Sequence, residues 1–179
     1  MGDRTYTSIE FSGDISEQQA EELIGLLDDQ CGDDASGIPL VQGHAERKFT
    51  LEHLCVPHNS FSDDECNYAT MDEIESWCTL NRVSYLKTWA AGGDYVAGLE
   101  LYDYALKTAE QVAALDSSPA ISLSDLIKIR DEGEIDKAIE RLNKFENFSK
   151  KYPPLKIYAL NDWPDDLCKF LAERALLGE

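Results

Sequence analysis

The sequence predicts an α+β fold in which an antiparallel or mixed sheet carries helices on one face. Runs with alternating polar and apolar side chains, amphipathic helical stretches between these runs, and short connections all support this class. The predicted order is β-α-β-α-β-β, followed by a helical hairpin and a C-terminal helix. We expect an acidic α+β domain over 1–115 and, over 116–179, the hairpin with a C-terminal strand and helix.

The first strand and first helix are predicted from the N-terminal region. Side chains alternate over residues 4–11, which predicts a strand. Ser16 precedes a helix predicted over 17–30, and Gln19 stands at the third position after it, which is the capping-box pattern. The apolar residues of this helix are spaced for one buried face, so its acids are expected outside that face.

The middle of the chain completes the predicted sheet. Residues 31–43 are expected to form a loop, 48–56 a second strand, and 59–67 an acidic turn. Thr70 is expected to cap a helix over 71–81. The last two strands, 83–90 and 95–102, form a hairpin around Gly92-Gly93, because a Gly-Gly centre supplies the positive φ angles of a tight turn.

Beyond Asp116 the pattern becomes helical. Ser122 begins one helix, Gly133 ends it, and residues 134–145 form a second helix. The spacing predicts that this second helix buries Ile135, Ala138, Ile139 and Leu142. An edge strand is expected over 155–160, and a last helix from Pro164 to about Leu177.

Acidic residues are concentrated in the first part of the chain. Residues 1–103 carry 21 Asp and Glu against 5 Lys and Arg, a net charge of −16 out of −19 for the whole chain. Such charge destabilises a compact state by self-repulsion, and solubility needs far less of it. It favours a surface that meets a cationic partner, although an ordinary solvated face is the alternative. The candidate binding residues are Glu17, Glu21, Glu22, Asp28, Asp29, Asp33, Asp34, Asp63, Asp64, Glu65, Asp72, Glu73 and Glu75.

The composition disfavours several other classes of protein. No apolar run has the length of a membrane span and no secretory signal is recognisable, so we expect a cytoplasmic protein without a membrane partner. The five cysteines include no CxxC pair, so neither a disulfide framework nor a zinc ribbon is indicated. We expect no cofactor and no metal.

Enzymatic chemistry has little support in the sequence. There is no G-x-S-x-G, Walker, G-x-G-x-x-G or H-E-x-x-H motif. A thiol and imidazole pair formed by Cys55 or Cys66 with His58 is one possibility, and Cys78 and His53 would add metal ligands. A Cys/His-dependent or metal-dependent enzyme is therefore a third interpretation, which requires these side chains to converge in space.

Direct contact with nucleic acid is also disfavoured. A phosphate backbone needs cations, and in the predicted hairpin the bases are interleaved with acids, which favours surface ion pairing. Acidic helices can instead imitate nucleic acid, since carboxylates one turn apart lie about 5–6 Å from one another at Cβ. A basic protein or nucleoprotein complex is the expected partner.

Several segments resemble small, largely uncharacterised accessory proteins of phages and plasmids. The resemblance covers residues 70–157 and rests on Met71-Asp-Glu-Ile-Glu-Ser-Trp-Cys, Val83-Ser-Tyr-Leu-Lys-Thr-Trp, Tyr95-Val-Ala-Gly-Leu-Glu-Leu-Tyr-Asp103, Ile121-Ser-Leu-Ser-Asp-Leu-Ile, Asp131-Glu-Gly and Tyr152-Pro-Pro-Leu-Lys-Ile157. It implies a mobile-element setting, in which small acidic proteins act against restriction enzymes and CRISPR complexes. It supplies no catalytic residues.

The sequence thus predicts a non-enzymatic acidic binding protein. We expect a DNA mimic that occupies the basic nucleic-acid groove of a host defence complex, as an anti-CRISPR or anti-restriction protein does. The alternative is an immunity or antitoxin protein that neutralises a basic toxin by the same complementarity.

Overall fold

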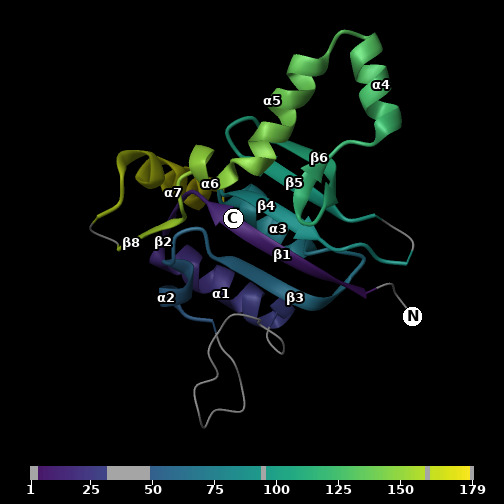
Figure 1. The fold of residues 1–179 in the computed structure, drawn as a ribbon. Helices are drawn as coiled ribbons and strands as arrows, with labels where there is room; N and C mark the ends of the chain where they lie inside the picture. The colour runs from purple at the N-terminus through teal and green to yellow at the C-terminus, as the bar shows by residue number, and fades with distance from the viewer. Residues whose placement is uncertain (1–3, 32–48, 94–95, 160–161, 178–179) are drawn as a thin grey trace.

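The protein has an α+β fold built on a six-stranded antiparallel sheet (Figure 1). The computed structural model describes residues 4–31, 49–93, 96–159 and 162–177. The strand order in the sheet is β3-β1-β4-β5-β6-β7. These strands are β1 (Arg4–Ser12), β3 (Ser60–Asn67), β4 (Ser84–Trp89), β5 (Gly98–Asp103), β6 (Thr108–Leu115) and β7 (Ser118–Ala120).

Helices lie on both faces of this sheet, and two short strands form a separate parallel pair. The pair joins β2 (Asp14–Ser16) to β8 (Lys156–Tyr158), far apart in sequence. The helices are α1 (Glu17–Cys31), α2 (Leu51–Leu54), α3 (Asp72–Leu80), α4 (Leu123–Asp131), α5 (Ile135–Glu146), α6 (Phe148–Lys151) and α7 (Asp165–Leu177). We call α1 with α3 the helix layer, and α4 with α5 the arm.

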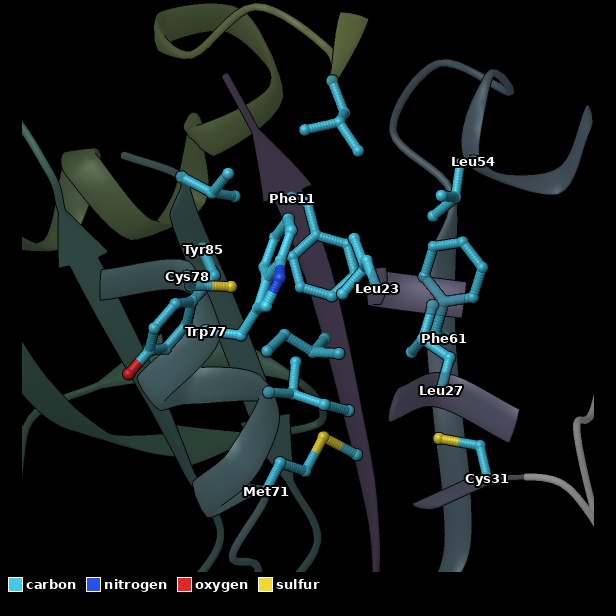
Figure 2. Packing of buried hydrophobic residues seen from close by; sticks show 14 of the residues in the cluster. Phe11, Leu23, Leu27, Cys31, Leu54, Phe61, Met71, Trp77, Cys78 and Tyr85 are labelled. Atoms are coloured by element: carbon cyan, nitrogen blue, oxygen red, sulfur yellow. The ribbon is translucent and has the colours of Figure 1, made fainter. Parts of the chain in front are cut away.

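The main core lies between the helix layer and one face of the sheet. Leu23 and Leu27 of α1 and Trp77 of α3 pack against Phe11 of β1 and Phe61 of β3 in one buried cluster (Figure 2). These helical positions follow the 3.6-residue period, which places them on the inner side of each helix. The acids of α1 and α3 are consequently left on the outer side.

A second, smaller core lies on the opposite face of the sheet. Leu99 and Leu101 of β5 pack against Phe145 of α5, Phe148 of α6 and Tyr152. Neighbouring residues of a strand point to opposite faces, so Leu101 belongs to this cluster while Tyr102 belongs to the main core. The arm is therefore attached to the face away from the helix layer.

The predicted capping of the first helix is confirmed. The backbone N–H of Gln19 donates to Ser16 Oγ at 3.2 Å, and the Ser16 N–H donates to Gln19 Oε1 at 2.9 Å. This is the reciprocal capping box. Gln19 also donates through Nε2 to Asn81 Oδ1 at 2.8 Å, which links the start of α1 to the end of α3.

The second predicted strand is wrong. The short helix α2 lies within 48–56, and the strand that pairs with β1 is β3, where an acidic turn was expected. A β-bulge explains the error. Thr5 pairs with Cys66 and Thr7 with Asp63, so β3 has one extra residue there and its side chains do not alternate along its whole length. As an edge strand, β3 also tolerates charges that a central strand would not.

The predicted hairpin has the right strands but the wrong turn. Trp89 pairs with Gly98, so eight residues connect β4 to β5 instead of a tight Gly-Gly turn. Two further strands, β6 and β7, were not predicted, and they extend the sheet across the expected unit boundary at residue 115. The polar, alternating pattern of β6 suits a strand with one exposed face.

The C-terminal helices begin where expected, but one of them packs differently. Ser122 Oγ accepts from the Asp125 N–H at 3.1 Å, and Gly133 has φ of 74° where the helix was predicted to end. Ile135 and Ile139, expected inside, are exposed instead. Across the described ranges, no helix is both long and apolar enough to cross a membrane.

Candidate binding surface

The outer side of the helix layer is lined by carboxylates and carries no base. Neither α1 nor α3 contains Lys or Arg. The two helices are in contact, and Trp77 Nε1 of α3 donates to Glu22 Oε2 of α1 at 3.2 Å. Both helices therefore present their exposed acids on the same side of the sheet (Figure 1).

Five of the predicted residues make up what we call the acidic face: Glu17, Glu21, Asp29, Asp72 and Glu73. All five are exposed, and none of them takes part in a salt bridge within the described residues. An exposed carboxylate without an internal cation keeps its full charge for an external partner. This face is the candidate binding surface.

Three other predicted residues have internal hydrogen-bond partners. Glu22 accepts from Trp77, Asp28 Oδ1 accepts from the Phe49 N–H at 2.8 Å, and Asp63 Oδ2 accepts from Gln30 Nε2 at 2.9 Å. Asp28 and Asp63 are half-buried. These carboxylates hold α1 to its neighbours, and they add negative potential behind the acidic face.

Glu75 lies in a buried polar network between α3 and the sheet. Its Oε1 is 2.5 Å from Lys87 Nζ, and Lys87 Nζ is 3.6 Å from Glu100 Oε1. Tyr85 donates to Glu100 Oε1 at 2.7 Å, and Gln111 Nε2 donates to the other Glu100 oxygen. The Lys87 and Glu100 side chains are only 7% and 8% exposed, so Glu75 pairs with a buried cation.

Burial and hydrogen bonding act in opposite directions on the pKa values in this network. Burial alone would raise the pKa of Glu100, but hydrogen bonds from Gln111 and Tyr85 and the Lys87 charge outweigh it and lower the pKa. The pKa of the Tyr85 hydroxyl is strongly raised by burial and by its bond to Glu100. The network therefore stays charged on Glu100 and neutral on Tyr85 at neutral pH.

The remaining predicted acids are placed only in part. Asp33 and Asp34 lie outside the described residues. Asp64 and Glu65 lie on β3 at the bulge opposite β1, but their side chains are outside the described part of the structure. None of these four residues belongs to the acidic face.

Aromatic residues near the acids differ in exposure. Tyr68 is exposed in the turn between β3 and α3, where Tyr68 and Ala69 both have positive φ, 53° and 56°. Trp77 is buried in the main core, as most helical Trp residues are. Trp89 lies across Gly98, where a β-carbon would collide with its ring. Tyr68 is thus an aromatic that a partner of the helix layer can reach.

The cysteines and histidines do not form a site in the described chain. Cys66 and Cys78 are buried, and burial raises the pKa of both thiols, which disfavours a reactive thiolate. His58 Nδ1 lies 2.8 Å from Glu10 Oε1. Among the described residues, no three His, Cys, Asp or Glu side chains come together as a metal site.

Sequence reasoning missed the Glu75, Lys87 and Glu100 network. A signal was present, since Lys87 is the one charge in β4 and Glu100 stands between two leucines in β5, at positions directly opposite in the β4–β5 register. An isolated charge in such a strand suggests a buried partner of opposite sign. The third member, Glu75, lies on α3, and no pattern in the sequence shows that this helix packs over Lys87.

Comparison of the chain with protein-family models, with curated proteins and with solved structures found no match. The resemblance to phage and plasmid accessory proteins stays a prediction.

Proposed function

We propose that the protein works by binding and that its acidic face occupies the basic nucleic-acid groove of a host defence nucleoprotein complex in the host cytoplasm, as an anti-restriction or anti-CRISPR DNA mimic. One observation carries this proposal. Two adjacent helices that contain no base present five exposed acids, and none of the five is in a salt bridge with another described residue.

The spacing of the acids on α1 suits this role. From Glu17 to Asp29 the helix axis advances roughly 18 Å at about 1.5 Å per residue. One strand of B-DNA places about five phosphates over the same length, at about 3.4 Å each. Over this length α1 carries five acids: Glu17, Glu21 and Asp29 lie on the acidic face, and Glu22 and Asp28 add negative potential behind it. A groove lined by Lys and Arg would therefore meet three carboxylates on α1, supported by the potential of two more.

Asp29 lies where its charge lowers the stability of the helix, which suggests that the charge serves binding. It lies in the last turn of α1, which has no base, although the negative end of the helix dipole disfavours an anion there. Glu17 and Glu21 are one turn apart, and like charges at that spacing repel. A surface that keeps such charges despite their cost is consistent with selection for a cationic partner.

The test compares two variants that lose the same charge. In the first, the acidic face is neutralised by Glu17→Gln, Glu21→Gln, Asp29→Asn, Asp72→Asn and Glu73→Gln. In the control, five exposed arm acids are neutralised by Asp131→Asn, Glu132→Gln, Asp136→Asn, Glu140→Gln and Glu146→Gln. Partners are captured from host lysate at low salt, eluted with duplex DNA, identified, purified and titrated against each variant.

We expect a basic nucleoprotein complex whose affinity falls steeply with salt and whose DNA binding the wild-type chain inhibits. Neutralising the acidic face should weaken binding by about tenfold or more, because several charge contacts are lost together, while the control should bind as wild type. Equal losses in both variants would remove the acidic face as the contact. Recovery of one basic toxin in place of such a complex would favour the immunity or antitoxin alternative.

A further inference from the structure

The arm exposes the apolar residues that its sequence pattern was expected to bury. α4 has no buried residue, and Leu123 is 73% exposed. On α5, Ile139 is 52% exposed, while Phe145 at its far end is buried against the sheet. The exposed aliphatic set is Leu123, Leu126, Ile127, Ile135 and Ile139. A nine-residue helix with no buried side chain gains little from its own fold, so a covering surface would stabilise it.

Next to these residues the arm encloses a hollow. α4 and α5 meet near Gly133 and separate toward the β6–β7 hairpin (Figure 1). The space between the two helices and this hairpin has a volume of about 430 Å³, and its apolar lining includes Val112, Ala120, Ile121, Ile129, Ala138 and Leu142. Charged groups on its rim are paired inside the chain, as Lys137 with Glu134 at 2.5 Å and Arg141 with Glu110 at 3.3 Å. The rim therefore offers no net charge to a ligand.

Charge distinguishes a second copy from other occupants. Residues 123–151 contain seven Lys and Arg and seven Asp and Glu, so the arm region has no net charge in a chain of −19. Two such chains repel each other when their first 103 residues approach, whereas two arms can approach without that penalty. A basic partner would be drawn to the acidic face instead of the arm.

The position of the arm allows this approach. It is attached to the sheet face opposite the helix layer, through Phe145 and the second core. In Figure 1 the arm and α1 lie at opposite ends of the view, with the sheet between them. Two copies joined at their arms would keep their helix layers apart.

We propose that two copies of the chain associate through their arms, each covering the exposed aliphatic residues and the hollow of the other. The contact uses the same residues from both copies, as a two-fold dimer requires. The dimer does not depend on the proposed function. Its consequence does rest on that function, because a dimer would present two acidic faces and so bind a nucleic-acid groove with higher avidity.

The test is sedimentation of the full chain over a wide concentration range at low and high salt. We expect a species of twice 20.1 kDa that forms more readily at high salt, because salt screens the repulsion between the two acidic chains. This salt dependence is opposite in sign to that expected for binding a basic partner. The arm is tested with a double variant that adds no charge, Leu123→Gln with Ile139→Gln. It should raise the dissociation constant of the dimer by about tenfold or more.

The control is Leu80→Gln, which changes a comparably exposed aliphatic residue, 54% exposed, on α3. It should dimerise as wild type. The neutralised acidic-face variant should dimerise as wild type at high salt and more readily at low salt, because it carries less repulsive charge. A monomer at every concentration and salt would overturn the proposal. A dimer that the Leu123 and Ile139 changes leave intact would also overturn the arm as its contact. The acidic-face variant tests binding and the arm variant tests dimerisation, so the failure of one proposal can be distinguished from the failure of the other.

Discussion

The helix layer and the arm are both built from amphipathic helices, but they differ in which side chains are covered within the chain. In the helix layer the apolar residues are covered by the sheet and the exposed acids stay unpaired within the described chain. In the arm the apolar residues stay exposed and several acids are paired with neighbouring bases, as in Lys128 with Asp125 and Arg130 with Asp131. One region offers charge to a partner, and the other offers apolar surface.

This difference teaches that amphipathic periodicity reports two faces but not what covers them. Both regions show apolar residues at helical spacing, and only the sheet behind α1 and α3 turns that spacing into a core. The two regions can be compared by breaking the buried ion pair under α3 and an exposed ion pair of the arm, and measuring the loss of stability in each case.

The largest expected effect comes from removing the cation beneath the helix layer. Lys87→Met leaves Glu75 and Glu100 without their buried ion-pair partner, which should cost about 3–5 kcal/mol of unfolding free energy. Lys137→Met in the arm breaks an exposed pair, which solvent screens, and should cost far less. Denaturant unfolding of both variants measures the difference, and equal losses would contradict the contrast between the two regions.

The next effect separates the anchored end of the arm from its exposed end. Phe145→Ala removes a buried ring from the second core and should destabilise the protein by about 3–5 kcal/mol. Ile139→Ala removes an exposed side chain, and at concentrations where the chain is a monomer it should change stability by about 0.5 kcal/mol or less. Thermal unfolding at low protein concentration checks both. A large loss from Ile139→Ala there would mean that this residue is buried within one chain.

Acid should act on the sheet beneath the helix layer through Glu100. Its pKa is lowered in the folded state below the ordinary value of 4.5, so its charge stabilises the fold above that pH. The contribution is lost as the pH falls through the lowered pKa. Glu100→Gln should therefore be less stable at neutral pH and lose less stability than wild type on acidification. Glu140→Gln on the arm controls for one formal charge, and identical pH profiles for the Glu100 variant and wild type would contradict this role.

The smallest effect tests whether the acidic face is kept at a cost in stability. Asp29→Asn removes an anion from the C-terminal turn of α1, where the helix dipole disfavours it, and should raise the unfolding free energy by about 0.3–1 kcal/mol. Glu17→Gln removes an anion from the first turn, where it is favoured, and should lower stability by a similar amount. A stabilised Asp29→Asn chain that binds its partner less well would connect the charge with function.

The sequence by itself determined the elements whose signals are local. Ser16 and Gln19 lie three residues apart and fix the start of α1, and Gly133 ends a helix with its own positive φ. The α+β class and the outward acids of α1 also follow from short-range periodicity. Such features need only neighbouring residues, so they can be recognised along the chain.

Only the tertiary structure decided which of these residues are free to act. Glu73 and Glu75 are two positions apart on α3, yet Glu73 is exposed while Glu75 reaches a lysine on the sheet. Likewise Leu27 is buried and Ile139 is exposed, although both occupy the apolar side of an amphipathic helix. Burial and ion pairing depend on partners distant in sequence. For the Glu75 carboxylate these partners are Lys87 and Glu100, and for Leu27 they are the strands of the sheet. The pattern along a single helix does not contain those partners.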